Sequence, residues 1–461
     1  MRSKHPSLDF LLQEGNLAEA HHHRDQLLQL YTDCDLVAAE GNRAISPRMT
    51  PMHVVPSTSG GSTEADFKMG RGEVVRRLST QELDARVADM LTSEPAAKHL
   101  EQVGTLEFDA VSFAETVPHT IFVLFAWLEE RLRLIKQVRD LGQVGNAANF
   151  HARLMHFMEK VNSLYKDTNP FHNSTHAADV VSTLEWFFRS EYLQARASSL
   201  DHLITLIGGA IHDVGHPGQA NNFQQKTLSM YAIRYNDKSI LENMHVSLSF
   251  EIMHGDLACN WFSLLPTDYR HAGAPSEDSA PAVNLQQYVR KALVQMVLAT
   301  DMMRHAKAVQ DLKNFVEEQE ALTTEVDETG QKHEQKQVAL EKKLLTLDTI
   351  LHAADISNAA RPRGVMLKWT QRVLMEFWAQ GDEEKRLGLA ISPLCDRETE
   401  QWAVPKGQLG FTNYVVMPLY TPLSQLIPEV REGLDNLRSN VAFWEELDSK
   451  QASHDQIFSA L

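Results

Sequence analysis

Apolar residues recur at helical spacing over most of this chain, and this pattern most restricts the folds open to it. The clearest sets lie within residues 150–164, 289–297, 369–377 and 430–444. Each set places one apolar stripe on one face of a helix, and most of its members are expected in a core. Strand signals are scarce, and the short apolar run at 414–417 is not resolved by periodicity. We therefore predict a compact all-α domain of many helices over residues 81–461.

Residues 1–80 differ from the rest of the chain. The stretch 49–72 is rich in proline, glycine, serine and threonine, which is typical of a loop or linker. Three consecutive histidines at 21–23 could suggest a metal site, but a solvated polar run explains them better because no further ligand lies at a useful spacing. We interpret residues 1–80 as an N-terminal extension with little core potential. The polar stretch 326–336 is interpreted as a loop.

The charge balance limits the partners of this protein. Basic residues number 44 and acidic residues 61, which gives a formal net charge of −17. Nucleic acid and anionic membrane surfaces are therefore not expected as partners. A phosphate substrate remains open, since nearby cations dominate the electrostatics of a site.

Cysteine usage and hydropathy indicate where the protein resides. The three cysteines are sparse and widely spaced, which argues against a disulfide framework and suits a reducing compartment. No secretory pattern opens the chain, and its most apolar short run, 121–128, is too brief for a membrane span. We expect a soluble cytoplasmic protein. Its oligomeric state is left open, with a homodimer as one option.

Histidines and aspartates form several close groups in helix-like context. His172 and His176 are four residues apart, so they can face one direction on a helix or across its first turn. Asn173 is a plausible N-cap, which would place His172 just outside the helix and His176 inside it. Taken alone, such a pair is more often structural or exposed.

A second group follows an apolar helix. His212 and Asp213 come directly after the run 203–211, which reads as a helix buried nearly all round. A buried His-Asp pair is unfavourable unless it is hydrogen-bonded or bound to metal. Glycines and a proline then end the helix, with His216 in the turn. A helix-ending loop with a capping aspartate is the alternative.

Two further groups lie later in the chain. Asp355 also follows an apolar helical segment and shares a face with His352, so a hydrogen-bonded core pair competes with a metal-ligand role. Asp301 and His305 form a similar pair, for which we favour a surface position. Together, His176, His212, Asp213 and Asp355 make a mixed nitrogen and oxygen set without cysteine. This composition disfavours a closed thiolate zinc site and leaves coordination positions for water.

These residues belong to a longer series of motifs. The series comprises His-Asn-x-x-His-Ala-x-Asp-Val at 172–180, His-Asp-Val-x-His-Pro-Gly at 212–218, Leu-Glu-Asn-x-His at 241–245, Ala-Thr-Asp-Met at 299–302, Ala-Asp-Ile-Ser-Asn at 354–358, Ile-Ser-Pro-Leu-Cys-Asp at 391–396 and Gly-Gln-Leu-Gly-Phe at 407–411. In order and spacing the chain resembles the catalytic domain of class I cyclic nucleotide phosphodiesterases, a branch of the metal-dependent His-Asp hydrolases. The resemblance begins at about residue 100.

The resemblance implies two metal sites. One tightly held ion, typically Zn²⁺, is expected on His176, His212, Asp213 and Asp355. A second ion, usually Mg²⁺ or Mn²⁺, is expected to share Asp213 and to be held otherwise mostly by water. Glu242 and Thr300 match positions that anchor those waters, and His216 matches a position near the bridging solvent.

Phosphodiester chemistry suits this assignment. Two cations about 3.5–4 Å apart can bridge one solvent molecule and lower its pKa from 15.7 toward roughly 7, which yields a hydroxide in line with phosphorus. The same cations neutralise charge on the phosphate oxygens. The 3′ oxygen leaves poorly unless it is protonated, and His172 matches the general acid of the family. A modest rise from the usual histidine pKa near 6.5 would keep it protonated at neutral pH.

Residues of the C-terminal third match the family's substrate pocket. Gln408 matches the glutamine that hydrogen-bonds the purine edge, while Phe411 and Val373 match the two sides of an apolar clamp on the base. Periodicity alone would place Val373 in the core and Gln408 in an exposed loop. The chain departs from common family choices at Phe171, Gly215, Ala359 and Met417, none of which is an expected ligand.

The sequence thus predicts a metal-dependent 3′,5′-cyclic nucleotide phosphodiesterase that yields 5′-nucleoside monophosphates. A preference for cAMP over cGMP is expected because Asn358 matches an asparagine that faces the adenine amino edge in cAMP-preferring relatives. Gln408 can present either end of its amide, so both nucleotides stay open. The alternatives are a non-catalytic cyclic-nucleotide sensor and a His-Asp hydrolase of non-cyclic nucleotides.

Overall fold

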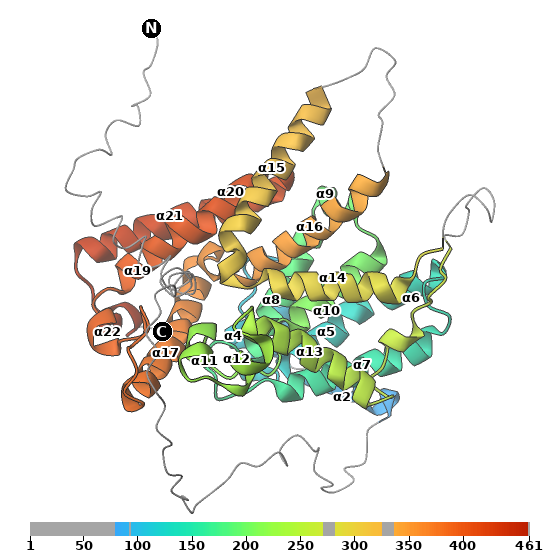
Figure 1. Cartoon of the computed structure of the whole chain (residues 1–461), viewed down its shortest axis with the longest axis horizontal. Coiled ribbons are helices and arrows are strands. Elements are labelled where there is room, and N and C mark those ends of the chain that lie inside the picture. Colours follow the sequence, from blue (N-terminus) through green and yellow to red (C-terminus); the bar gives the residue numbers. More distant parts are fainter. Residues whose placement is uncertain (1–78, 92–93, 271–281, 325–335, 460–461) are drawn as a thin grey trace, which may run out of the picture.

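The computed structural model describes residues 79–91, 94–270, 282–324 and 336–459 (Figure 1). The predicted linker at 49–72, the histidines at 21–23 and nearly all of the predicted loop at 326–336 lie outside these residues. Across the described ranges every regular element is a helix, apart from one isolated bridge between Tyr269 and Val283. The all-α prediction is confirmed.

The helices follow one another through short turns. Those up to residue 255 are α2 (Thr80–Leu91), α3 (Glu94–Leu100), α4 (Ala110–Thr116), α5 (Thr120–Leu132), α6 (Leu134–Asp140), α7 (Ala147–Leu164), α8 (Ser174–Phe188), α9 (Glu191–Arg196), α10 (Ser199–Ile211), α11 (Asn221–Lys226), α12 (Met230–Tyr235) and α13 (Ile240–Gly255). Those that follow are η3 (Phe262–Leu264), α14 (Leu285–Ala299), η4 (Met302–Arg304), α15 (His305–Thr324), α16 (Lys336–Asp355), η5 (Ser357–Ala360), α17 (Arg363–Arg386), α18 (Arg397–Glu400), α19 (Val404–Phe411), η6 (Thr412–Val416), α20 (Met417–Leu426), η7 (Pro428–Val430), α21 (Arg431–Ser449) and α22 (His454–Phe458).

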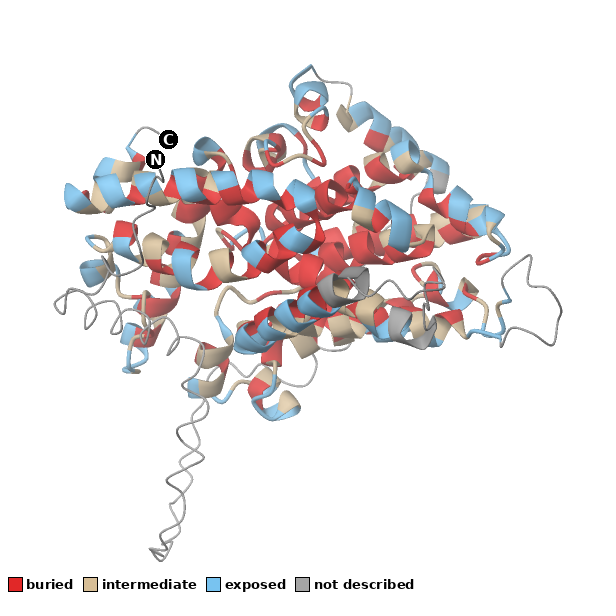
Figure 2. Ribbon diagram, turned by 90° about the horizontal axis from the view of Figure 1, so that it is seen from above, coloured by how far each residue is buried: buried red, intermediate tan, exposed pale blue. Residues whose placement is uncertain are grey.

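Helices α8 and α10 form the centre of the molecule. They pack on each other, α5 and α16 pack against α8, and α14 packs against α10. Every residue of α8 is buried, and Figure 2 shows the buried residues gathered in the middle of the helical assembly. A helix that is buried on all sides must be apolar nearly all round, as the sequence of α10 is. Polar side chains on these two helices therefore need partners.

Close contact between α8 and α10 depends on Gly209. A Cβ atom at this position would lie 2.6 Å from Leu184 Cδ1, which is closer than carbon atoms approach. Because glycine has no side chain, the C-terminal end of α10 lies directly against α8. This contact brings the residues that follow α10 next to the first turn of α8.

The ends of these helices follow the sequence signals. The Asn173 side chain accepts hydrogen bonds from the backbone amides of Thr175 and His176, so the predicted N-cap is confirmed. Helix α10 ends at Ile211, and the turn after it contains Gly215 and Gly218 with φ of +76° and +87°. Left-handed backbone of this kind favours glycine, which is why the chain can turn sharply after Asp213.

A buried ion pair attaches the segment before α17 to α8. Arg361 Nη2 lies 2.9 Å from Asp179 Oδ2, and both side chains are buried. Arg361 also donates to the backbone oxygens of Thr105 and Leu106, which precede α4. One guanidinium therefore joins three parts of the chain around the centre of the fold.

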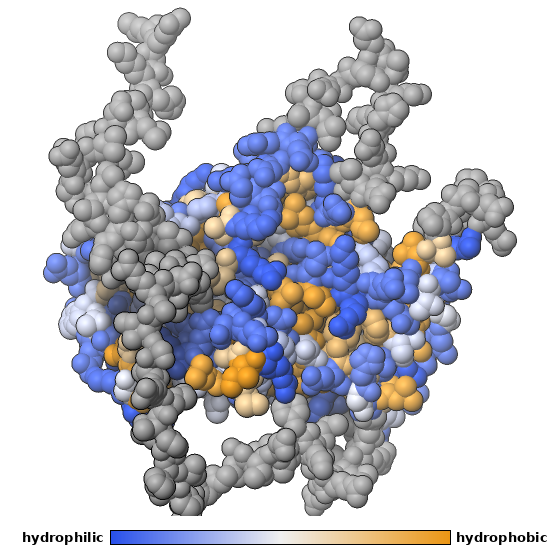
Figure 3. Space-filling model, in the orientation of Figure 1, coloured by the Kyte–Doolittle hydropathy of each residue, from blue (hydrophilic) through white to orange (hydrophobic). Residues whose placement is uncertain are grey.

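The surface is mainly polar. Figure 3 shows hydrophilic side chains over much of the face viewed, with separate hydrophobic patches between them. Among the described helices, no single one is long and apolar enough to cross a membrane, although α4 and α5, bent by 100° relative to each other, pass such a test as a pair. Most of α5 is buried in the core.

Candidate functional site

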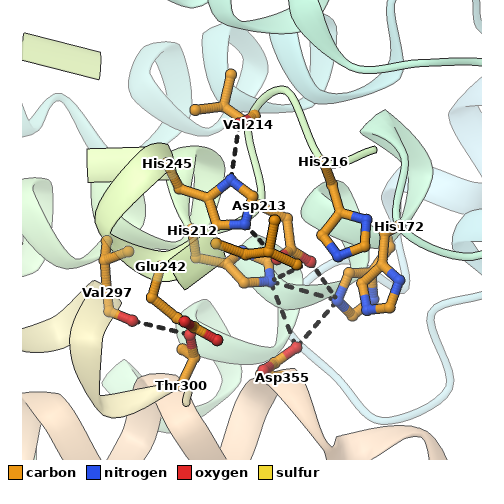
Figure 4. Close-up of polar contacts among 12 residues, drawn as sticks. His172, His212, Asp213, Val214, His216, Glu242, His245, Val297, Thr300 and Asp355 are labelled. Atoms are coloured by element: carbon orange, nitrogen blue, oxygen red, sulfur yellow. Dashed lines mark hydrogen bonds and ion pairs between the residues drawn. The ribbon is translucent and has the colours of Figure 1, made fainter. Parts of the chain in front are cut away.

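Two imidazoles and two carboxylates meet where α8, α10 and α16 converge. His176 lies in the first turn of α8, His212 and Asp213 follow α10, and Asp355 ends α16. Their donor atoms all lie within 4.8 Å of one another. Figure 4 shows His212, Asp213 and Asp355 directed toward one point. The fold thus brings together the four side chains that the sequence predicted as metal ligands.

The spacing of these donor atoms fits a tetrahedral cation. His212 Nε2 lies 3.1 Å from Asp213 Oδ2 and 3.3 Å from Asp355 Oδ1. His176 Nε2 lies 3.0 Å from Asp355 Oδ1. Ligands at about 2.0–2.1 Å from a tetrahedral zinc ion stand roughly 3.3–3.4 Å apart. The buried Oδ2 atom of Asp213 has no hydrogen-bond partner within the described part of the chain, as is expected of an oxygen that binds a metal.

The electrostatics of this group also suit a cation. His212 Nδ1 donates to the carbonyl oxygen of Gly209 at 2.8 Å, which leaves the lone pair of Nε2 directed into the site. Burial alone would raise the pKa of the Asp355 carboxyl, but hydrogen bonds with His176 and His212 outweigh it and hold this pKa well below its usual range. Against the same effect of burial, the charge of His212 holds the pKa of Asp213 well below its usual range. Both carboxyl groups are ionised at neutral pH.

Additional polar groups surround Asp213. His245 donates through Nδ1 to the carbonyl oxygen of Val214 at 2.8 Å, and its Nε2 lies 3.5 Å from Asp213 Oδ1. Glu242 accepts two hydrogen bonds of 3.1 Å from Asn221 Nδ2. Burial and the charge of Asp301 raise the pKa of Glu242 to about 8. Carboxylates this close repel one another, and a second cation would relieve that repulsion.

One sequence interpretation of this region is wrong. Asp301 and His305 were expected as a surface pair, but both are buried. Asp301 accepts a hydrogen bond of 2.7 Å from Ser239 Oγ, while His305 Nδ1 lies 2.9 Å from His352 Nε2. The pair follows the end of α14, where helical spacing no longer indicates which side faces the core. Thr300, the residue before Asp301, donates through Oγ1 to the Val297 carbonyl oxygen at 2.8 Å.

His172 lies beside this group with its own carboxylate. Its Nδ1 contacts Glu376 Oε1, and the other oxygen of Glu376 accepts from the backbone amides of Phe171 and His172 at 2.9 and 3.0 Å. Its ring stacks on that of His216, with centroids 4.0 Å apart. Burial lowers the pKa of His172, but the charges of Glu376 and Asp213 outweigh it and raise the pKa to about 9. His172 is therefore a cationic imidazole at neutral pH.

The sequence analysis missed Glu376. This residue lies in the middle of α17 and is 204 positions from His172, so no local spacing connects the two. Its own signal was a carboxylate beside Phe377, inside the apolar stripe at 369–377. A charge in such a stripe needs a partner, and the histidines of the motif at 172–180 were the candidates.

Asn169 was also missed. Its Nδ2 donates to the carbonyl oxygens of His172 and His216, both at 2.9 Å. One amide thus joins the backbones of the two histidines whose rings stack. The same side chain fills the space that a Cβ on Gly218 would need, because that atom would lie 2.7 Å from Asn169 Oδ1.

A pocket of about 450 Å³ opens beside these groups. Of the site residues expected from the sequence, those that line it are His172, Asp213, His216, Glu242, Thr300, Asp355, Asn358, Val373, Gln408 and Phe411. His176 and His212 do not line the pocket and are 2% and 0% exposed. The pocket therefore joins the metal-ligand group to an apolar region formed by other helices.

The apolar region has two walls from different elements. Val373 projects from α17 and Phe411 from α19, and both are partly buried against the core. Gln408 precedes Phe411 by three positions, so it shares a helix face with it. Its amide makes no hydrogen bond with the described residues and is available to a ligand. Gln408 lies on a helix rather than in the loop that periodicity alone indicated.

Comparison with known families identifies residues 171–437, which match the model described as 3′5′-cyclic nucleotide phosphodiesterase. Among curated relatives, a 3′,5′-cyclic-AMP phosphodiesterase 4C of Rattus norvegicus is 33% identical over 75% of this chain and 58% of its own length. A probable 3′,5′-cyclic-AMP phosphodiesterase of Caenorhabditis elegans is 30% identical over 84% of this chain and 53% of its own length. A human high-affinity cAMP-specific phosphodiesterase 8A is 32% identical over 81% and 44%. The chain spans about half the length of these relatives.

Solved structures share the fold. Two crystal structures of the phosphodiesterase domain of a rhodopsin phosphodiesterase from the choanoflagellate Salpingoeca rosetta are 24% identical to this chain, with TM-scores of 0.60 and 0.59. Each similarity covers 79% of this chain, and 98% and 95% of the two solved chains. At this identity the similarity shows a common fold.

Proposed function

Because the chain belongs to the 3′5′-cyclic nucleotide phosphodiesterase family, we propose that it hydrolyses 3′,5′-cyclic nucleotides to 5′-nucleoside monophosphates. The observation that carries this proposal is the meeting of the His176, His212, Asp213 and Asp355 donors beside a pocket that also contains a cationic His172. A binding protein would need the pocket but not a proton donor held next to it.

Two divalent cations would supply Lewis acidity and an activated water, one ion held by His176, His212, Asp213 and Asp355 and the other by Asp213 with water anchored on Glu242 and Thr300. We propose Zn²⁺ for the first site, whose nitrogen and oxygen ligands suit it, and Mg²⁺ or Mn²⁺ for the second, which is rich in carboxylates.

His172 acts as the general acid in this proposal. In the reaction a bond forms between the water oxygen and phosphorus, and the bond from phosphorus to the 3′ oxygen breaks. The departing 3′ oxygen needs a proton, and the His172 imidazolium lines the pocket where it can give one. Glu376 orients the ring through Nδ1, which leaves Nε2 to face the substrate. His216, stacked on the same ring, restricts its rotation.

The apolar part of the pocket would bind the base. Val373 and Phe411 can pack on its two faces, and the free amide of Gln408 can hydrogen-bond its edge. We propose cAMP as the preferred substrate because three curated relatives are named as cyclic-AMP enzymes and because Asn358 lines the same pocket. An amide offers both a donor and an acceptor, so a lower activity on cGMP is compatible with this proposal.

Nucleotide hydrolysis by the purified protein tests the proposal. We expect conversion of cAMP to 5′-AMP, a lower kcat/KM for cGMP, and loss of both activities on treatment with a chelator, with recovery on adding Zn²⁺ and Mg²⁺. Non-cyclic nucleotides serve as the control substrates. Turnover that survives metal removal, or tight cAMP binding without turnover at saturating metal, would reject the proposal, and a higher kcat/KM for cGMP would reject the preference.

A further inference from the structure

One wall of the pocket is a segment without regular structure. Residues 387–396, here called the wall segment, connect α17 to α18, and Pro393, Leu394 and Cys395 in it line the pocket. Leu394 has a φ of +63°, in the left-handed region that a leucine rarely adopts. Such backbone persists only where the surroundings hold it. The shape of this wall therefore depends on what fixes the segment.

Helix α17 provides the surface on which the wall segment rests. A Cβ atom on Gly381 would lie 1.9 Å from the carbonyl oxygen of Cys395, so the segment lies directly on the helix backbone. Three residues beyond Gly381, the carboxylate of Glu384 accepts hydrogen bonds from Ser392, at 2.6 Å from its backbone amide and 2.5 Å from its hydroxyl. The Glu384 side chain is 0% exposed. A carboxylate buried this completely is costly without a nearby cation.

Lys226 is the cation that faces it. This residue ends α11, and its ammonium group lies 3.3 Å from Glu384 Oε1. It also donates to the carbonyl oxygen of Ala390 and to Ser392 Oγ, both at 2.9 Å. An ammonium group has three hydrogens, and here each has an acceptor. Two of these acceptors belong to the wall segment and the third to the helix beneath it.

Amide side chains complete the same group. Gln380 accepts from the backbone amide of Ala220 at 2.8 Å, and its Nε2 lies within 3.4 Å of acceptors on Asn222, Glu384 and Ser392. These are neutral contacts and cannot balance the charge of Glu384. In the described part of the chain, Lys226 is the basic residue that forms an ion pair with this carboxylate.

We propose that Lys226 is a positioning residue that fixes the wall segment against α17 and thereby sets the affinity of the pocket for its nucleotide. The proposal rests on the function proposed above, because it identifies the occupant of the pocket as a cyclic nucleotide. Lys226 acts through Ala390 and Ser392 rather than by touching the reacting atoms. Its removal should weaken substrate binding more than it slows the chemical step.

Replacement of the cation tests this role. In Lys226→Met the length of the side chain is kept and the three donors are lost. We expect faster amide hydrogen exchange within 387–396, a KM for cAMP raised roughly tenfold, and a kcat within about twofold of the original, since loss of uniform binding changes KM alone. Metal content should not change. Exchange is measured on the protein without nucleotide, so this result does not depend on activity.

Lys385→Met is the matched control. Lys385 Nζ pairs with Glu398 Oε1 at 2.6 Å, so this pair also connects α17 to α18 across the wall segment. Its side chains are 59% and 72% exposed, and a solvated pair of this kind contributes little. We expect its exchange and its KM to match those of the original chain. An equal effect in both variants would show that Lys226 has no special part.

A second variant covers the risk that Lys226→Met fails to fold. Ser392→Ala removes the hydroxyl that both Lys226 and Glu384 bind, while the two charges stay paired. We expect it to raise exchange in the wall segment and KM in the same direction by a smaller factor. Unchanged exchange and KM in folded Lys226→Met would overturn the proposal, as would a fall in kcat accompanied by loss of metal. If the original chain hydrolyses neither nucleotide, the proposed function fails, and the exchange measurement alone decides the role of Lys226.

Discussion

His172 and Glu376 together illustrate how a buried imidazole can be kept protonated. A histidine removed from water would normally lose its proton, because burial disfavours the charged form. Here the ionised Glu376, whose own pKa is lowered to about 2 by His172 despite the opposing effect of burial, more than compensates. The direction of both shifts follows from one contact between Nδ1 and a carboxylate.

The pH dependence of the reaction should report this pair. If protonated His172 is required, kcat should stay high below its pKa of about 9 and fall as pH rises through that value. In Glu376→Gln the largest contribution that raises the pKa is lost while burial remains. The falling limb should then move to lower pH by more than one unit, measured as kcat against pH at saturating cAMP.

Metal content serves as the control for that experiment. Glu376 contacts His172 and backbone amides rather than the four proposed ligands, so Glu376→Gln should retain both ions. A falling limb that stays near pH 9 in this variant would exclude the ionised glutamate as the cause of the raised pKa.

Removal of the imidazole itself should separate catalysis from metal binding. We expect His172→Ala to lower kcat for cAMP by about 10²–10⁴-fold, the usual contribution of a general acid. Its metal content, measured by elemental analysis, should not change. The matched control is His254→Ala, an exposed histidine on α13, which should leave both quantities as they were. Loss of the metal from His172→Ala would mean that His172 is a ligand.

Sequence reasoning reached the side chains of the candidate site that stand in short motifs. His176, His212, Asp213 and Asp355 were found because imidazoles and carboxylates follow apolar helices, where their burial needs an explanation. Glu376 and Asn169 act through partners that the fold, and not the spacing of residues, brings near. Their contacts depend on how α17 and the turn after α10 are placed, and no local pattern encodes that placement.

At the scale of the element, the contact between α8 and α10 determines where the site forms. Gly209 allows the two helices to touch, and its carbonyl oxygen also holds the ring of His212. A side chain at this position would push α10 away from α8. His212 would move with α10, and His176 would stay with α8.

Two neighbouring glycines allow a direct test. Alanine stabilises a helix relative to glycine by about 1 kcal/mol, so each Gly→Ala change in α10 begins with that gain. Gly209→Ala would place a Cβ 2.6 Å from Leu184 Cδ1 and 3.3 Å from Val181 Cγ2. Overpacking of this kind costs about 1–3 kcal/mol, so we expect a lower Tm and weaker metal binding.

Gly208→Ala is the control for this prediction. Its Cβ would lie 3.2 Å from the terminal carbon of Met296, a flexible side chain that can move aside. We expect a Tm equal to or above that of the original chain. Similar losses of Tm in both variants would show that α10 tolerates no methyl group on either face.

Periodicity predicted the helices better than it predicted what their faces contact. The stripe at 369–377 correctly indicated a helix, and Trp369 in it is buried in the core. Val373 belongs to the same stripe but lines the pocket. An apolar residue satisfies a core and an apolar pocket equally well, so the pattern alone cannot separate them. The motifs shared with the family made that distinction.

At the scale of the whole molecule, the candidate metal centre joins helices from distant parts of the chain. A ligand that binds only the folded state stabilises it, by about 2.7 kcal/mol at a concentration of 100 times Kd. We therefore expect Zn²⁺ to raise the Tm of the chelator-treated protein by roughly 5 °C. Differential scanning calorimetry with and without the ion measures this.

Asp355→Asn provides the comparison. The amide keeps the size of the side chain but loses the charge, so the variant should gain much less from Zn²⁺ than the original chain. The exposed Asp382→Asn should respond like the original chain. A Zn²⁺-induced rise in Tm that persists in Asp355→Asn would place the ion elsewhere. The division at residue 80, the homodimer and the cytoplasmic location remain predictions.

The proposed metal centre has a consequence for biosynthesis. His176 and Asp355 contact each other across 179 positions, and Asp355 is the last of the four donors to be made. A nascent polypeptide would thus have an incomplete set of ligands until the ribosome has passed this codon. Fragments released earlier would lack a carboxylate that zinc requires. Acquisition of the ion is expected to mark the chains whose translation has gone beyond Asp355.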